Sequence, residues 1–201
     1  MDYKIRQNVA AEEGEYKVIG WDAAGEVVAV GAAVTWFKPG DQVYYAGDLT
    51  RSGTNAEYQL VDERIVGHKP RSLSDSEAAA LPLTTITAWE LLFEHLQLKQ
   101  KDAGSLEKSD EVVLVVGAAG GVGSILIQLA KTLTGATVIA TASREASRNW
   151  VRELGADFVV DHREPLKPQV DALISEGQVG AVTHVASLNA TEQYFDSYVD
   201  M

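Results

Sequence analysis

The stretch Glu111–Lys131 (EVVLVVGAAGGVGSILIQLAK) constrains the fold of this chain more than any other. It begins with an apolar, mostly β-branched run, Val112–Val116, which is typical of a strand buried on both faces of a parallel sheet. A turn of small residues follows, and apolar residues then recur from Leu126 to Leu133 at the spacing of an amphipathic helix. The stretch therefore predicts a strand, a tight glycine turn and a helix.

The glycine turn is a candidate phosphate site. The first N–H groups of a helix have no partner within it and carry its partial positive charge, so a phosphate can dock there if no side chain blocks the backbone. Ala118, Gly120 and Gly123 occupy the three glycine positions of the dinucleotide-binding fingerprint, with alanine in the first. A helix that simply packs closely on its strand would use the same small residues, and this alternative stays open. The predicted cofactor-binding residues of the turn are Ala118, Gly120, Gly121, Val122 and Gly123.

Composition narrows the class of partner. The 201 residues carry a net charge of −12 and include no cysteine. The negative charge argues against nucleic acid or an anionic membrane as partner, since both need basic surfaces. It would also repel an anionic cofactor at long range, so any phosphate site must supply local donors. No apolar run is long enough to span a bilayer and no signal-peptide pattern follows Met1, so we expect a cytoplasmic protein that binds a small molecule.

The chain ahead of the glycine turn has a different character. Short β-rich runs separated by glycines over Tyr16–Val66, including an alternating run at Ala56–Val61, predict a small β barrel or sandwich. Ser74 and Glu77 have the spacing of a capping box, which predicts a short helix. Thr84–Leu96 has helical periodicity.

A polar segment, Gln97–Asp110, is interpreted as a linker, and we predict a β-rich domain at 1–100 and a nucleotide-binding domain at 101–201. Beyond the first strand and helix, further strands alternate with helices. The predicted strands are Thr137–Ala142, Phe158–Val160 and Ala181–Ala186, and the predicted helices cover 145–155, 165–176 and 191–198. This order predicts an α/β fold with a Rossmann-type, doubly wound parallel sheet. A complete fold of this type has about six strands, so the four found here form an incomplete sheet.

The end of the second strand of that sheet indicates which cofactor is preferred. In NAD-specific sites an acidic residue there binds the ribose 2′-hydroxyl. Here Ser143 and Arg144 follow the strand, and both can bind a 2′-phosphate, which favours NADP(H); His162, after the third strand, could also reach it. Alternatively, Ser143 caps the next helix and Arg144 is a solvated surface residue. The nearby acids Glu145 and Asp161 count slightly against NADP(H).

Seven segments, taken in order, resemble the medium-chain dehydrogenase/reductase superfamily in its zinc-independent quinone oxidoreductase branch. They are Asp2–Arg6, Val18–Gly31, Phe37–Tyr45, Asn55–Glu63, Glu77–Leu92, Val115–Lys131 and Leu154–Asp157. The resemblance implies a GroES-like β-rich domain, a Rossmann domain and a cleft in which NADPH reduces a quinone, enone or related carbonyl compound. Family members are longer at both ends, so both domains are expected to be incomplete, and the full-length form is expected to be a homo-oligomer.

The family's zinc branch offers a comparison for metal ligands. Its Gly-His-Glu segment matches Gly20-Trp21-Asp22 here, so tryptophan replaces the ligand histidine, and a second ligand position, usually cysteine, matches about Ala80. The first ligand position would fall before Met1, and the four-cysteine lobe that holds structural zinc has no counterpart. We therefore expect no metal site.

The resemblance also suggests catalytic residues. It implies that Thr84 lies near the nicotinamide, and we expect Tyr3 and Tyr45 to supply hydroxyls near the substrate. Leu188 follows the fourth strand, at the carboxyl edge of the sheet where ligands bind, and is predicted to belong to the cofactor site. Tyr45 could equally be an ordinary strand aromatic.

Two rival classes of protein compete with this interpretation. A short-chain dehydrogenase needs Tyr-x-x-x-Lys, which none of the seven tyrosines forms. A non-catalytic nucleotide-binding or structural relative, or an inactive truncated chain, stays an alternative that turnover would distinguish.

Overall fold

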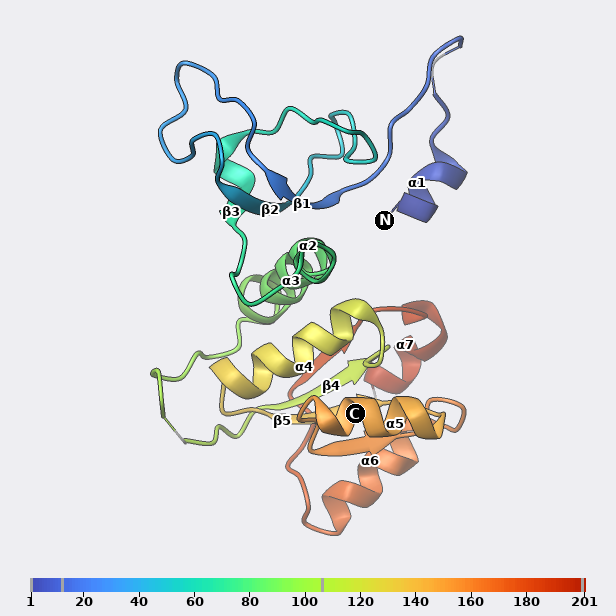
Figure 1. Ribbon diagram of the computed structural model, residues 1–201. Coiled ribbons are helices and arrows are strands. Elements are labelled where there is room, and N and C mark those ends of the chain that lie inside the picture. Colours follow the sequence, from blue (N-terminus) through green and yellow to red (C-terminus); the bar gives the residue numbers. More distant parts are fainter. Residues whose placement is uncertain (1, 12, 106, 200) are drawn as a thin grey trace. The chain divides into compact units, whose positions relative to one another are not determined.

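A computed structural model describes residues 2–11, 13–105, 107–199 and 201 of the chain (Figure 1). The chain divides into two compact units, Met1–Thr84 and Thr85–Met201, and the boundary falls inside helix α3 (Pro82–Trp89). The predicted domain limit at residue 100 stays a prediction. Among the described residues, no helix has both the length and the apolar character needed to cross a membrane.

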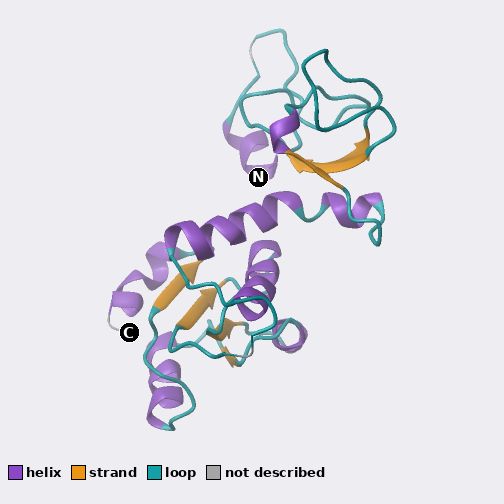
Figure 2. Cartoon of the chain, turned by 90° about the vertical axis from the view of Figure 1, so that its left-hand side faces the viewer, coloured by secondary structure: helices purple, strands orange, loops and turns teal. Residues whose placement is uncertain are grey.

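One small antiparallel sheet organises the N-terminal unit, and loops join most of its elements (Figure 2). The elements in order are α1 (Asp2–Asn8), β1 (Asp22–Glu26), β2 (Gln42–Ala46), the 3₁₀ turn η1 (Glu63–Ile65), β3 (Val66–His68) and α2 (Asp75–Ala79). β2 is the central strand, with Tyr44 opposite both Ala24 of β1 and Gly67 of β3. A turn at Pro39 and Gly40 precedes β2, and Gly40 adopts a φ of +92°, which favours glycine.

The predicted strand Ala56–Val61 is wrong. The segment pairs with no strand among the described residues, and Tyr58 and Leu60 are 74% and 86% exposed. Alternation alone cannot make a strand when neither face is buried and no neighbour supplies hydrogen bonds. Gln59 instead joins two other parts of this unit, since it accepts from the Tyr45 hydroxyl at 2.6 Å and donates to the Ser52 carbonyl at 2.6 Å.

Helix α1 was not predicted from the sequence. None of its residues is buried, so it has no apolar stripe for a pattern to detect. Side-chain bonds four residues apart support it: Gln7 donates to the Tyr3 hydroxyl at 2.8 Å, and Asn8 donates to the Lys4 carbonyl at 2.8 Å.

The capping box before α2 is confirmed. The Ser74 hydroxyl accepts from the Glu77 N–H at 3.3 Å, and the Glu77 carboxylate accepts from the Ser74 N–H at 2.9 Å. α3 then begins at Pro82, in the first turn, where a missing N–H costs no helical hydrogen bond. The predicted helix Thr84–Leu96 corresponds to the end of α3 and the π-helical segment η2 (Glu90–His95).

The C-terminal unit contains the predicted parallel sheet. Its strands are β4 (Val112–Val116), β5 (Thr137–Thr141), β6 (Phe158–Val160) and β7 (His184–Ser187), and its later helices are α4 (Gly121–Leu133), α5 (Glu145–Glu153), α6 (Leu166–Ser175) and α7 (Thr191–Val199). All strand pairs are parallel, in the order β6-β5-β4-β7. This is the 3-2-1-4 order of a doubly wound sheet, so the predicted fold class is confirmed.

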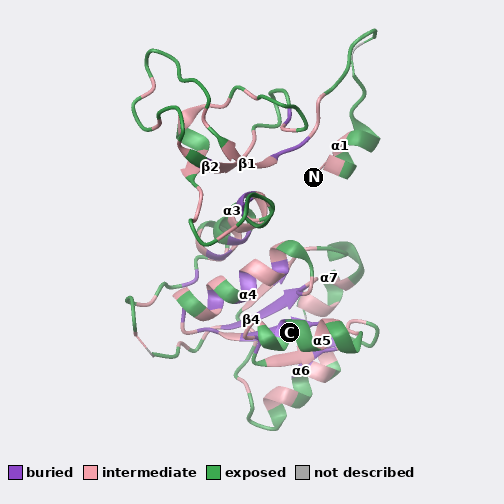
Figure 3. Cartoon of the chain, in the orientation of Figure 1, coloured by how far each residue is buried: buried purple, intermediate pink, exposed green. Residues whose placement is uncertain are grey.

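β4 is the strand around which both layers pack, and it is buried along its whole length (Figure 3). Val113 and Val115 belong to one apolar cluster with Leu126 and Ile127 of α4 and with Val151 of α5. The alternate residues of β4 belong to a second cluster that includes Leu166 of α6 and is flanked by Tyr194 and Tyr198 of α7. Helices therefore cover both faces of the sheet, as its continuous apolar sequence predicts.

The start of the fourth strand and the predicted linker differ most from the prediction. The fourth strand begins at His184 rather than Ala181, because the Thr183 hydroxyl takes the place of a backbone partner and accepts from the Val112 N–H at 2.9 Å. The segment predicted as a linker lies against the C-terminal unit: Leu98 is buried, and Lys101 and Ser109 donate backbone hydrogen bonds to Leu133 and Gly135.

Shortening a buried side chain of β4 should lower the stability of the protein. Leu114 is fully buried, so Leu114→Ala should lower the free energy of unfolding by about 2–5 kcal/mol, through lost transfer energy and a new cavity. Denaturant unfolding followed by circular dichroism measures this. Leu60→Ala, the same change at an exposed position, should alter stability by less than about 0.5 kcal/mol. Equal effects of the two changes would contradict the assigned core.

Candidate nucleotide site

The turn between β4 and α4 leaves backbone donors without partners. Gly117, at a φ of +81°, ends the strand, and its N–H donates to the Thr141 hydroxyl of β5 at 3.1 Å. Gly120 is the N-cap of α4 and has no side chain to cap the helix. The first hydrogen bond of the helix joins the Ser124 N–H to the Gly120 carbonyl at 2.8 Å. Within the part of the chain described, the N–H groups of residues 121–123 have no acceptor, which is the arrangement that binds a phosphate.

Close packing explains some of the small residues of this turn but not all. A Cβ on Gly123 would lie 2.5 Å from the Ala118 carbonyl oxygen, and Ala118 itself is fully buried. These two residues therefore let α4 approach β4. Gly120 is different, because a Cβ there would have only the Gly117 carbonyl within 4 Å, at 3.3 Å. Gly120 therefore keeps the backbone accessible, which packing alone does not require.

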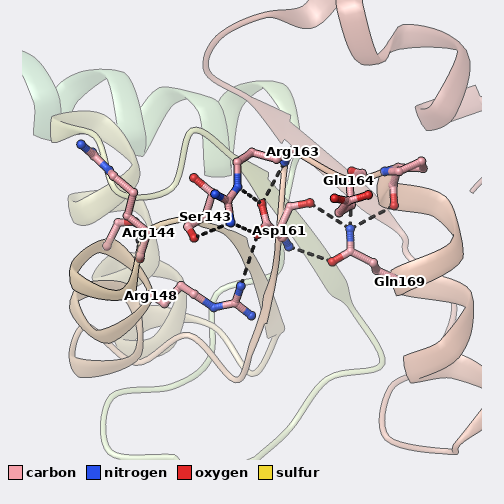
Figure 4. Close-up of polar contacts among 9 residues, drawn as sticks. Ser143, Arg144, Arg148, Asp161, Arg163, Glu164 and Gln169 are labelled. Carbon is pink, nitrogen blue, oxygen red and sulfur yellow. Dashed lines mark hydrogen bonds and ion pairs between the residues drawn. The ribbon is translucent and has the colours of Figure 1, made fainter.

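The residues after β5 lie at the carboxyl edge of the sheet. Arg144 is the N-cap of α5 and makes no capping bond with its side chain, so the alternative that Ser143 caps this helix is wrong. The Arg144 side chain is exposed, has no hydrogen-bond or ion-pair partner within the described ranges, and points away from Asp161 (Figure 4). Its guanidinium is therefore free to bind an anion.

Two arginines that sequence reasoning missed belong to the same edge. Arg163 contacts the Asp161 carboxylate with its Nε at 3.2 Å and a terminal nitrogen at 2.7 Å, and Arg148 lies 3.6 Å from the same carboxylate (Figure 4). Hydrogen bonds from Arg163 hold the pKa of Asp161 well below its usual range. Two spacings could have revealed the cluster: Arg148 is one helical turn after Arg144, and Arg163 is two residues after Asp161.

The other predicted cofactor residues also follow strand ends. His162 follows β6 and is half-buried, and its carbonyl accepts from the Tyr194 hydroxyl at 3.0 Å. Leu188 follows β7, and its N–H donates to the Val116 carbonyl at 3.1 Å. Asn189, beside it, lies against the glycine turn, since a Cβ on Gly117 would come 2.9 Å from its amide oxygen. Because the strands are parallel, these residues share one edge with the turn.

The three predicted catalytic residues lie in the N-terminal unit, and no hydrogen bond joins any two of them within its described residues. Tyr3 is 70% exposed on α1. The Tyr45 hydroxyl donates to Gln59, and burial raises its pKa, so it stays protonated at neutral pH. The Thr84 hydroxyl donates at 3.0 Å to the carbonyl of Leu81, the residue before α3.

At the positions that match the histidine and cysteine ligands of the zinc branch, the chain has Trp21 and Ala80. Trp21 is 1% exposed, and its indole N–H donates to the Asp48 carbonyl at 3.1 Å, so it offers no lone pair to a metal. Asp22 accepts from the Leu83 N–H at 2.8 Å, and burial raises its pKa. Ala80 has only a methyl side chain. The described residues contain no group of three or more His, Cys, Asp or Glu that could hold a metal ion.

Two family models match the chain. The model of the alcohol dehydrogenase GroES-like domain matches residues 1–71, and the model described as zinc-binding dehydrogenase matches residues 121–201. A zinc-type alcohol dehydrogenase-like protein of Staphylococcus aureus is 42% identical over 185 residues, which cover 92% of this chain and 53% of that protein. The chain therefore spans about half the length of the curated relatives it matches.

Solved structures of dehydrogenases and oxidoreductases are also similar to this chain, again over about half of their own length. A structure from Rhizobium etli, named as a zinc-dependent alcohol dehydrogenase, is 50% identical with a TM-score of 0.87, over 99% of this chain and 55% of that one. The quinone oxidoreductase of Escherichia coli in complex with NADPH is 30% identical with a TM-score of 0.73, over 90% of this chain and 52% of that one.

Gly123 offers a test of the turn. Gly123→Ala should force α4 away from β4, because the new methyl would lie 2.5 Å from the Ala118 carbonyl oxygen. We expect a loss of stability of about 1–3 kcal/mol from overpacking, and a loss of nucleotide binding. Thermal unfolding and a nucleotide titration measure the two effects. Gly31→Ala is the matched control, since its Cβ would meet nothing within 4 Å, and an equal loss there would refute the close approach.

Proposed function

Because the chain belongs to the medium-chain dehydrogenase/reductase superfamily, we propose that it acts as an NADPH-dependent oxidoreductase that reduces a quinone, enone or related carbonyl compound without zinc. The observation that carries the proposal is the uncapped N-terminus of α4 at the same sheet edge as an unpaired Arg144. The first feature suits a pyrophosphate and the second suits a further phosphate. The Escherichia coli quinone oxidoreductase that this chain resembles was solved with NADPH.

Charge at the edge supports NADPH over NADH. No acid directly follows β5, where an NAD-specific site would place one, and Asp161 is paired with Arg163 and Arg148. Its charge is therefore neutralised by neighbours. The local donors that a chain of net charge −12 needs are present at this edge, in Ser143 and Arg144.

Hydride chemistry is supplied by the nicotinamide nucleotide when it is bound, and the protein must position the reactants and stabilise the oxygen that gains charge. Without zinc, hydroxyl groups can do this. Tyr45 is the strongest of the three candidates, because its hydroxyl is partly buried and held in place by Gln59, whereas the Tyr3 side chain is 70% exposed. Tyr3 and Thr84 remain proposals of the same kind, as does a homo-oligomeric full-length form.

A non-catalytic, nucleotide-binding role is the second candidate. It predicts NADPH binding with no oxidation of NADPH when quinones or enones are added. Following absorbance at 340 nm with 1,4-benzoquinone as acceptor distinguishes the two roles, since turnover supports the reductase and its absence supports binding alone.

The NADPH preference is tested by parallel fluorescence titrations with NADPH and NADH. We expect Arg144→Ala to weaken NADPH binding roughly 10- to 100-fold and to leave NADH binding unchanged, because a charge-assisted hydrogen bond is worth about 1.5–3 kcal/mol. Arg152→Ala removes the same charge from the far end of α5 and is the matched control. Equal weakening of both nucleotides by Arg144→Ala would contradict a 2′-phosphate contact.

The proposed hydroxyl role is tested by Tyr45→Phe. We expect kcat to fall about 100-fold, in the range typical of a lost proton donor, while Kd for NADPH stays constant. Tyr44→Phe is the matched control: it removes a tyrosine hydroxyl from the neighbouring position on β2 and should leave kcat unchanged. If both variants keep full activity, Tyr45 is an ordinary strand aromatic.

A further inference from the structure

The cluster at the ends of β5 and β6 contains a contact that crosses between the two strand ends. A terminal nitrogen of Arg163 donates both to the Asp161 carboxylate at 2.7 Å and to the Ser143 carbonyl at 3.2 Å (Figure 4). Ser143 follows β5, whereas Asp161 and Arg163 follow β6. One guanidinium therefore ties the loop after β5 to the loop after β6.

The acid in this cluster is itself firmly held. Its carboxylate accepts from the Arg163 N–H at 2.9 Å as well as from the guanidinium, and its side chain is only 15% exposed. Gln169 of α6 holds the backbone of Asp161 from the other side, accepting from its N–H at 2.8 Å and donating to its carbonyl at 2.9 Å (Figure 4). Asp161 is thus a fixed anchor for Arg163.

We propose that Asp161 and Arg163 are positioning residues for NADPH recognition, and that together they hold the Ser143–Arg144 segment in place as a 2′-phosphate site. This inference rests on the proposed function. Arg163 binds Asp161 in bidentate fashion and can also restrain Ser143. The backbone of Ser143 is restrained by this contact, while the Ser143 hydroxyl and the Arg144 guanidinium have no hydrogen-bond or ion-pair partner among the described residues and are free to bind a phosphate.

An acid near a phosphate site is usually expected to repel the phosphate, whereas an anchoring role makes Asp161 favour NADPH binding. If Asp161 acted only through its charge, removing that charge would strengthen NADPH binding. If Asp161 anchors Arg163, removing the charge releases the guanidinium, loosens the loop after β5 and weakens NADPH binding. The two roles therefore predict opposite signs for one substitution.

The test is a set of NADPH and NADH titrations on the full chain and three variants. Asp161→Asn should weaken NADPH binding at least fivefold and leave NADH binding within twofold. Arg163→Lys keeps the charge but loses the bidentate geometry, and should have the same effect. Asp171→Asn removes an equal charge from the exposed Lys167–Asp171 pair and should leave both affinities unchanged. Circular dichroism establishes that each variant is folded.

The outcomes separate this inference from the proposed function. If the unmodified chain prefers NADPH and both cluster variants keep that preference, the positioning role is overturned and the proposed function stands. Tighter NADPH binding by Asp161→Asn also overturns it, since the acid then acts by repulsion. If the unmodified chain binds NADPH and NADH equally, or binds neither, the NADPH preference and the positioning role both fail.

Discussion

The approach of α4 to β4 at Gly123 is the constraint on which the C-terminal unit depends. The helix lies so close to the Ala118 carbonyl that no side chain fits between them, and this contact fixes where the helix begins. Its first N–H groups then project beyond the end of β4 at the carboxyl edge of the sheet. The same close contact that packs the core thus creates the donor site, so packing and binding are two consequences of one geometry.

The other residues of the candidate site reach the carboxyl edge of the sheet because its strands are parallel. Because every strand ends on the same side, residues far apart in the sequence meet there: the glycine turn after β4, Ser143 and Arg144 after β5, His162 and Arg163 after β6, and Leu188 and Asn189 after β7. A net charge of −12 would oppose a phosphorylated ligand at long range. The backbone donors and arginines at this edge attract a phosphate at short range. Carboxylates elsewhere on the chain are farther away, and salt screens their repulsion of the phosphate.

The C-terminal unit could be predicted from sequence because its strands are buried on both faces. A run such as Val112–Val116 has a single stable environment, and β4, β5 and β6 lie within one residue of the predicted limits. The N-terminal unit lacks that property. Its alternating run at Ala56–Val61 has no buried face, and α1 has no apolar stripe, so pattern alone gave a false strand and missed a helix.

In the candidate site, too, sequence predicts some features and misses others, and the features that it misses are contacts between side chains. The glycine turn has a spacing that sequence can detect, because a phosphate-binding backbone demands small residues at fixed positions. The spacings Arg144 to Arg148 and Asp161 to Arg163 are visible in the sequence, but the contact of Arg163 with Ser143 is not, since it forms only through the pairing of β5 with β6. Sequence reasoning therefore counted Asp161 as an isolated negative charge, whereas in the fold it is the acceptor that holds an arginine. The effect of an acid on a nearby phosphate site depends on its partners, which only the tertiary structure brings to it.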